Sequence, residues 1–135
     1  NVEQRVRELG VDHAVRFTGW ISDQKRKEEL LKAADVMCDP SRSQPFGMIV
    51  LETWACNRPV IAVHGTGSGE LVWHDTTGLK VYGNPNSIAW GVKNIFSDFD
   101  KARWMGDNGR KATEESFTWD HIAKCMLSVY EEVLK

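Results

Sequence analysis

The sequence has few cysteines and no long apolar run, and each of these features excludes some classes of protein. Its three cysteines, Cys38, Cys56 and Cys125, include no CxxC pair, so neither a zinc site nor a thioredoxin-type motif is supported. Cys38 and Cys56 lie in apolar runs and are expected in the core. We expect a reducing, cytoplasmic compartment. No apolar run approaches the roughly 18 residues of a membrane span, so no transmembrane segment is expected.

The chain also lacks an excess of charge of either sign. It has 17 Lys and Arg against 19 Asp and Glu, a formal net charge of −2, which gives no reason to expect nucleic acid as a partner. The one basic cluster, Lys25 to Lys27, is interpreted either as a phosphate site or as the solvated face of a helix. A chain of 135 residues with 41% hydrophobic residues fits one globular domain, residues 1–135.

The N-terminus shows no leader pattern. Residues 1–10 form a polar amphipathic stretch, which is not typical of a signal peptide, and they do not begin with Met. We therefore expect a processed or excised piece of a longer protein.

Short apolar runs alternate with helical patterns along the first two thirds of the chain, and the last third is helical. This alternation predicts an α/β fold with a Rossmann-like parallel sheet and helices on both faces. The expected strands cover residues 15–19, 35–41, 59–63 and 79–82. The expected helices cover residues 2–9, 24–34, 46–56 and 71–74, one capped by Asn84 or Asn86, residues 102–115, and one capped by Thr118.

The segment from Ser41 to Glu52 is the most informative part of the sequence. Ligands of open parallel sheets bind outside the carboxyl ends of the strands, and this segment follows a predicted strand. Its Pro45-Phe46-Gly47 sequence leads into an apolar helix, so the free amides of Gly47, Met48 and Ile49 are expected to face a ligand. A helix N-terminus of this kind favours anions, phosphates above all.

Glu52 interrupts that apolar helix. A carboxylate among buried residues is costly unless it is paired or lies at a site. Its expected role is to accept hydrogen bonds from a pair of hydroxyl groups on a ligand. The alternative is a surface Glu on an amphipathic helix, and the local pattern does not decide between the two.

The glycine-rich stretch from Gly65 to Gly69 lacks the G-x-G-x-x-G spacing of a dinucleotide site. It is either a nest of amides for an anion or a flexible loop. Glu70 beyond it is either a carboxylate at a helix N-terminus or a site residue. His64 before it either contacts a ligand or is a loop histidine whose hydrogen bonds are made within the chain. The six tryptophans are expected in the core and in interfaces, except Trp20, which follows the end of a predicted strand.

Several short motifs occur in a characteristic order and extend over nearly the whole chain. They are Val15–Gly19, Ala34–Val36, Pro40-Ser41, Pro45-Phe46-Gly47 with Leu51-Glu52, Arg58–Ala62, Gly69-Glu70, Thr77–Leu79 and Phe117-Thr118-Trp119. In this order they resemble the nucleotide-sugar-binding C-terminal domain of retaining glycosyltransferases of the GT-B architecture, family 4, glycosyl transferases group 1. The order and spacing of the set carry the resemblance, because no single motif is specific.

The resemblance implies the donor-binding part of a hexosyltransferase that takes a UDP-, GDP- or ADP-sugar and needs no metal or other cofactor. Glu52 matches the second Glu of the family's Glu pair, which holds the ribose hydroxyls. The Phe46–Ile49 backbone resembles the segment that holds the donor sugar and its diphosphate. Ser41 is also expected among the donor-binding residues. The backbone around Trp20 and Ile21 resembles the loop that contacts the base.

The sequence departs from the family pattern in two ways. Gln44 stands where the family has its first, catalytic Glu, so the position carries no negative charge. The family's upstream basic pair, the first two strands and the acceptor domain have no counterpart here. The chain alone is therefore expected to be inactive, and its expected partners are an acceptor domain or acceptor molecule and a second copy of itself at an open sheet edge.

Two alternatives remain open. One is a non-catalytic, truncated binding or assembly module of the same fold, in which Gln44 marks lost catalysis. The other is a different GT-B enzyme, such as a sugar-nucleotide epimerase.

Overall fold

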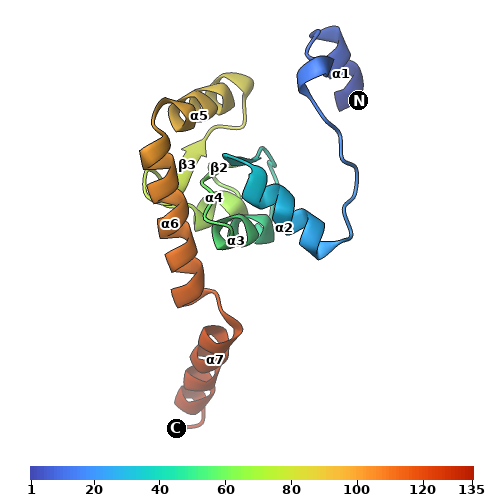
Figure 1. Cartoon of the computed structure of the whole chain (residues 1–135). Coiled ribbons are helices and arrows are strands. Elements are labelled where there is room, and N and C mark those ends of the chain that lie inside the picture. Colours follow the sequence, from blue (N-terminus) through green and yellow to red (C-terminus); the bar gives the residue numbers. More distant parts are fainter.

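A three-stranded parallel sheet forms the centre of the molecule, in a computed structural model that describes all residues from 1 to 135. Strands β1 (Met37–Asp39), β2 (Val60–Val63) and β3 (Gly78–Val81) lie in the order β1-β2-β3, with Cys38 opposite Ile61 and Ile61 opposite Leu79. The helices are α1 (Val2–Glu8), α2 (Gln24–Ala33), α3 (Met48–Ala55), α4 (Gly67–Leu71), α5 (Pro85–Ser97), α6 (Phe99–Ser116) and α7 (Trp119–Val133). A short 3-10 helix covers Asp12–Ala14. The predicted α/β class is confirmed (Figure 1).

Both faces of the sheet are covered, because the residues of β2 point alternately to either side and all are buried. Ile61 and Val63 pack with residues of β3, α5 and α6 in one apolar cluster. Val60 and Ala62 pack against α3 in a second cluster around Trp54. A strand buried on both faces reads as a continuous apolar run, which is why this strand was predictable.

Helices α3 and α6 pack closely because α6 has glycine at the contact. A Cβ atom at Gly109 would fall on the indole of Trp54, and one at Gly106 would fall on the backbone of Asn57. The buried indole also donates a hydrogen bond from its Nε1 to the carbonyl oxygen of Thr77, at 3.0 Å. Trp54 therefore joins α3, α6 and the turn before β3.

Side-chain caps start most helices where the sequence predicts them. Asp23, Asn84 and Thr118 each accept a hydrogen bond from the backbone N–H three residues later, as N-cap residues do. Asn57 follows α3 with a left-handed φ of 56°. These caps confirm the predicted boundaries of α2, α5 and α7 to within a residue or two.

Two predicted elements are wrong. Residues 15–19 form no strand: they are exposed coil, since the sheet contains only β1, β2 and β3 and a β-branched run needs a neighbouring strand to pair with. The short helix expected over residues 71–74 lies earlier, at α4, inside the glycine-rich stretch. Thr66 caps it by accepting a hydrogen bond from the Gly69 N–H at 3.1 Å, which offsets the low helix propensity of glycine.

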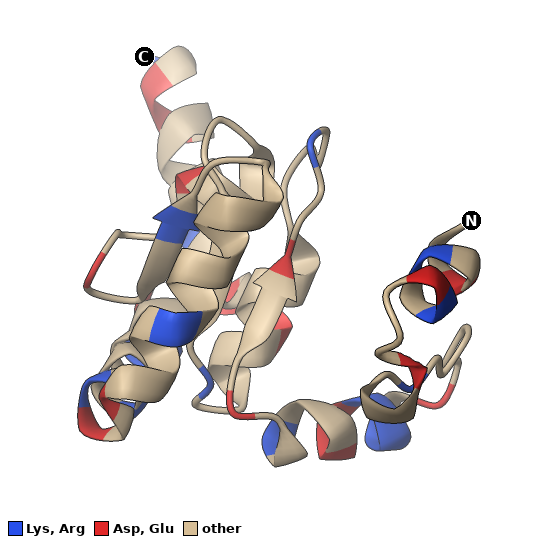
Figure 2. Cartoon of the chain, turned by 90° about the horizontal axis from the view of Figure 1, so that it is seen from above, with Lys and Arg blue, Asp and Glu red and all other residues tan.

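The two ends of the chain extend from this centre. Neither α1 nor α7 has a buried residue, and Figure 1 shows both helices projecting away from the sheet. The predicted apolar stripe of α7 is present but exposed, at Ile122, Met126, Val129, Tyr130 and Val133. Figure 2 shows acidic and basic residues mixed along α1 and α2 rather than gathered by sign. No helix combines the length and the apolar character needed to cross a membrane.

Asp39, the last residue of β1, connects the loop that follows β1 with helix α4, which follows β2. Its side chain is 8% exposed. Its Oδ2 accepts a hydrogen bond from Ser68 Oγ at 2.5 Å, and its Oδ1 accepts one from the Ser41 N–H at 3.1 Å. The Gly67 N–H also donates to the Gln44 carbonyl oxygen at 2.6 Å, so the loop after β1 is joined to α4 at a second point.

The charge of Asp39 is favoured in this setting. Burial raises the pKa of its carboxyl, but the hydrogen bonds from Ser68 and Ser41 together outweigh burial and leave the pKa below its ordinary value. A carboxyl with a depressed folded-state pKa stabilises the fold above its unfolded-state pKa. That stabilisation is lost as the pH falls through the folded-state pKa.

We expect Gly109→Ala to destabilise the fold by about 1–3 kcal/mol through its clash with Trp54, although alanine in a helix is favoured over glycine by about 1 kcal/mol. Urea denaturation followed by circular dichroism measures the change. Gly83→Ala is the control, because a Cβ there meets nothing closer than 3.5 Å. Equal stability of the two variants would contradict the packing described for α3 and α6.

We expect Asp39→Ala to lower the free energy of unfolding by about 1–3 kcal/mol at neutral pH, because it leaves buried donors without an acceptor. The difference from the unsubstituted chain should stay constant from pH 7 down to about pH 5 and shrink below that, as the pH falls through the lowered pKa of the folded-state carboxyl and protonation removes the same interactions. Denaturation at several pH values tests this. A difference that does not depend on pH would show that the ionised carboxylate is not what stabilises the loops.

Candidate functional site

The loop between β1 and α3 delivers a tight turn to the helix N-terminus. Gly47 ends the loop with a φ of 90°, a backbone conformation that residues with a Cβ rarely adopt. A Cβ at this position would also fall on Ser68, the residue held by Asp39. Both constraints explain why glycine stands here, at the cap of α3 rather than inside the helix expected over residues 46–56.

Three backbone amides at this turn are free. The N–H groups of Gly47, Met48 and Ile49 donate no hydrogen bond within the chain, whereas the next one, of Val50, donates to the Gly47 carbonyl oxygen at 2.9 Å. Phe46 and Met48 beside them are exposed. Free amides at a helix N-terminus carry partial positive charge, so this turn favours an anion.

Glu52 lies one helical turn beyond Met48 and is paired with α2. Its Oε1 accepts a hydrogen bond from Lys27 Nζ at 2.7 Å, and the two side chains are 28% and 32% exposed. Its Oε2 accepts no hydrogen bond within the chain and remains available. The cost of placing a carboxylate in an apolar helix is therefore met by Lys27, a partner that the sequence pattern did not identify.

A shallow cavity of about 270 Å³ adjoins Glu52 between α2 and α3. Its lining residues are Gln24, Glu28, Leu31, Glu52, Ala55 and Cys56. Space for a small polar group therefore exists on the side of α3 that carries the Glu52 carboxylate. No group of three or more His, Cys, Asp or Glu side chains in the chain is arranged to hold a metal ion.

Gln44 and Ser41 lie in the same loop, before the Gly47 turn. The backbone of each takes part in the loop contacts, but the side-chain amide of Gln44 forms no hydrogen bond within the chain. That amide is half-buried and remains available to a ligand.

Trp20 and Ile21 precede α2 in coil. Trp20 is 93% exposed, and Ile21 is half-buried. Their interpretation as the base-contacting loop stays a prediction. The other tryptophans are expected in the core and in interfaces. Trp54 is buried and confirms the first place, whereas Trp73, Trp90, Trp104 and Trp119 are exposed, so for them an interface stays a prediction.

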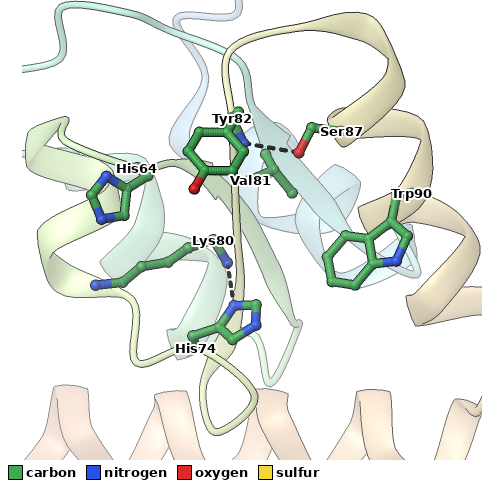
Figure 3. Close-up of a pocket in the computed structure, with 7 residues that line it drawn as sticks. All are labelled: His64, His74, Lys80, Val81, Tyr82, Ser87 and Trp90. Atoms are coloured by element: carbon green, nitrogen blue, oxygen red, sulfur yellow. Dashed lines mark hydrogen bonds between the residues drawn. The ribbon is translucent and has the colours of Figure 1, made fainter.

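The structure reveals a larger cavity that sequence reasoning missed, about 470 Å³ in volume, beside strand β3 (Figure 3). Its lining residues are His64, His74, Lys80, Val81, Tyr82, Ser87 and Trp90. They come from the loops after β2 and α4, from β3 and its end, and from α5. No spacing in the sequence connects them, so only the folded chain brings them together.

Known proteins share both the sequence and the fold of this chain. An uncharacterized glycosyltransferase of Methanocaldococcus jannaschii is 39% identical over 125 residues, which are 92% of this chain and 32% of that protein. The structure of sucrose-phosphate synthase from Thermosynechococcus elongatus superposes with a TM-score of 0.88 at 34% identity, over 98% of this chain and 33% of that one. HepE of Anabaena, in a crystal structure with UDP, superposes with a TM-score of 0.87 at 24% identity, over 97% of this chain and 36% of that one.

These similarities concern one part of each relative. The chain spans about a third of the length of the curated relatives it matches. At 24% identity the likeness to HepE shows the fold alone, and that fold is the one found in GT-B glycosyltransferases.

A family profile decides the assignment. The profile described as glycosyl transferases group 1 matches residues 1–112, which include the Gly47 turn, Glu52 and all three strands. The predicted resemblance is thereby confirmed, and the chain belongs to the glycosyl transferases group 1 family.

Proposed function

We propose that this chain binds the nucleotide-sugar donor of a retaining hexosyltransferase, with UDP, GDP or ADP as the nucleotide. The observation that carries the proposal is the set of free amides at Gly47, Met48 and Ile49, one helical turn from the carboxylate of Glu52. A nucleoside diphosphate sugar offers an anion to the first and a pair of ribose hydroxyls to the second.

In the proposed complex the diphosphate lies on the free amides at the start of α3. The ribose hydroxyls donate to Glu52 Oε2, while Lys27 holds Oε1 and orients the carboxylate. Trp20 and Ile21, in the coil just before α2, would face the base, and Ser41 would lie in the loop beside the sugar. The amide of Gln44 accepts or donates a hydrogen bond at a sugar hydroxyl.

The relatives support this ligand class. HepE of Anabaena, which shares the fold, has been crystallised with UDP and with UDP-glucose. Transfer breaks the bond between the sugar C1 and the diphosphate oxygen, so negative charge grows on the leaving group in the transition state. Amides that point at this oxygen stabilise that charge without a metal ion.

A second function, binding without transfer, is favoured by Gln44. Positive charge develops on the sugar during transfer, and a neutral amide stabilises it less than a carboxylate would. The exposed apolar stripe of α7 fits an assembly role, either with an acceptor domain or with a second copy of the chain. The three free cysteines fit the cytoplasmic location that we propose for both functions.

We expect Glu52→Ala to weaken nucleoside diphosphate binding at least about tenfold, because the ribose loses its charged acceptor. Calorimetric titration with UDP, GDP and ADP measures the loss and identifies the base. Glu114→Ala is the matched control, since Glu114 has an equally short ion pair, 2.7 Å to Arg110, on α6. Unchanged affinity in Glu52→Ala, with the fold intact by circular dichroism, would contradict the assigned role.

We expect Gln44→Glu to raise the slow transfer of the sugar from the bound donor to water, by about 10²-fold, because a carboxylate stabilises the cationic sugar. Release of nucleoside diphosphate measures the rate, and proton NMR of the first-formed sugar shows whether the anomeric configuration is kept. Donor binding should change much less than the rate. Binding without turnover in both proteins would favour the non-catalytic module.

A further inference from the structure

The cavity beside β3 is a groove along the outer edge of the sheet, because β2 is the only strand beside β3 and the other side is touched only by an isolated bridge between His74 and Gly78. In Figure 3 the strand runs between His64 and Lys80 on one side and Trp90 of α5 on the other. The proposed donor site at Gly47 lies in the loop after β1, at the opposite edge strand. The groove therefore shares no residue with the proposed donor site, and of its lining residues only His64 is considered above as a possible ligand contact.

Side chains close the backbone of this edge. The Lys80 N–H donates to His74 Nδ1 at 2.9 Å, and the Tyr82 N–H donates to Ser87 Oγ at 2.9 Å. An edge strand whose outward N–H groups are occupied does not readily add another strand. The groove consequently suits a small molecule rather than an extended peptide.

The groove presents a cation that is not neutralised. Lys80 forms no ion pair in the chain, and its ammonium group lies on the same side of β3 as His64 and the Tyr82 hydroxyl (Figure 3). The ring of His64 and the hydroxyl of Tyr82 form no hydrogen bond within the chain. Asp75, whose Oδ2 is 3.9 Å from His74 Nε2, is already held by Lys101 at 2.9 Å.

Aromatic rings line the groove on both sides of this cation. His74 and Trp90 lie nearly parallel, at 17° with 6.4 Å between ring centroids, and His64 lies 6.4 Å from the Tyr82 ring. Aromatic faces of this kind stack on bases and on the apolar faces of sugars. The volume of about 470 Å³ falls within the range of small-molecule sites.

We propose that the groove is a second binding site, for a phosphomonoester carried on a ring. Lys80 Nζ and the Tyr82 hydroxyl donate to the phosphate, with His64 as a third partner, and the ring lies against Trp90. A sugar phosphate and a nucleoside monophosphate share this chemistry. The site goes beyond the proposed donor function and does not depend on it.

The test is a titration of the ¹⁵N-labelled chain with glucose 6-phosphate, AMP and inorganic phosphate, followed by NMR. We expect at least one of the two esters to shift the amides of Lys80 and Tyr82 and the Trp90 indole, with a Kd of about 1 mM or tighter. Lys80→Met, which keeps the apolar stem, should weaken that binding at least about tenfold. Lys93→Met on α5 is the matched control, because Lys93 does not line the groove.

The two esters distinguish the sources of the ring. Tighter binding of glucose 6-phosphate identifies a sugar phosphate, and tighter binding of AMP identifies a nucleotide. Absence of shifts in the groove, equal affinity in Lys80→Met, or equal affinity for inorganic phosphate and both esters would overturn the proposal. Repeating the titration with Glu52→Ala separates the sites, because binding in the groove should persist when the donor carboxylate is removed.

Discussion

The buried carboxylate of Asp39 is the interaction on which the candidate donor site depends. It accepts hydrogen bonds from the loop after β1, through Ser41, and from helix α4, through Ser68. Ser68 in turn supports the Gly47 turn, where a side chain would collide with it. One ionised group at the end of a strand thus fixes the direction in which the first amides of α3 point.

The two edge strands of the sheet, β1 and β3, differ in what lies beside their outward backbone groups. At β3 the side chains of His74 and Ser87 occupy the outward amides, and the edge becomes the wall of a cavity. At β1 the only pairing is with β2, and the coil of residues 15–19 stays outside the sheet. The outward amides of the first edge are thus occupied within this chain, whereas the second edge has no strand beside it. The same contrast holds for α7, whose apolar stripe is formed but covers nothing here.

The sequence predicted most of the local structure because local chemistry determines it. Capping side chains at Asp23, Asn84 and Thr118 indicate where helices begin. The apolar run from Val60 to Val63 indicates a strand buried on both faces. The wrong predictions concern segments whose structure depends on neighbouring elements. Residues 15–19 have the composition of a strand but no strand beside them, and α4 forms within glycines because Thr66 caps it and the sheet supports it.

The sequence by itself determined the family, the glycine at the start of α3 and the position of Glu52, because each depends on the types of residues at short spacing along the chain. Only the tertiary structure decided that Lys27 pairs with Glu52, that Asp39 joins the loop after β1 to α4, and that His64, Lys80 and Trp90 share a cavity. These contacts join residues about 25 or more positions apart or on different elements. Their geometry depends on how α2, α3, α5 and the sheet pack against one another. Hydrophobic burial over the whole chain determines that packing, so no local sequence pattern predicts it.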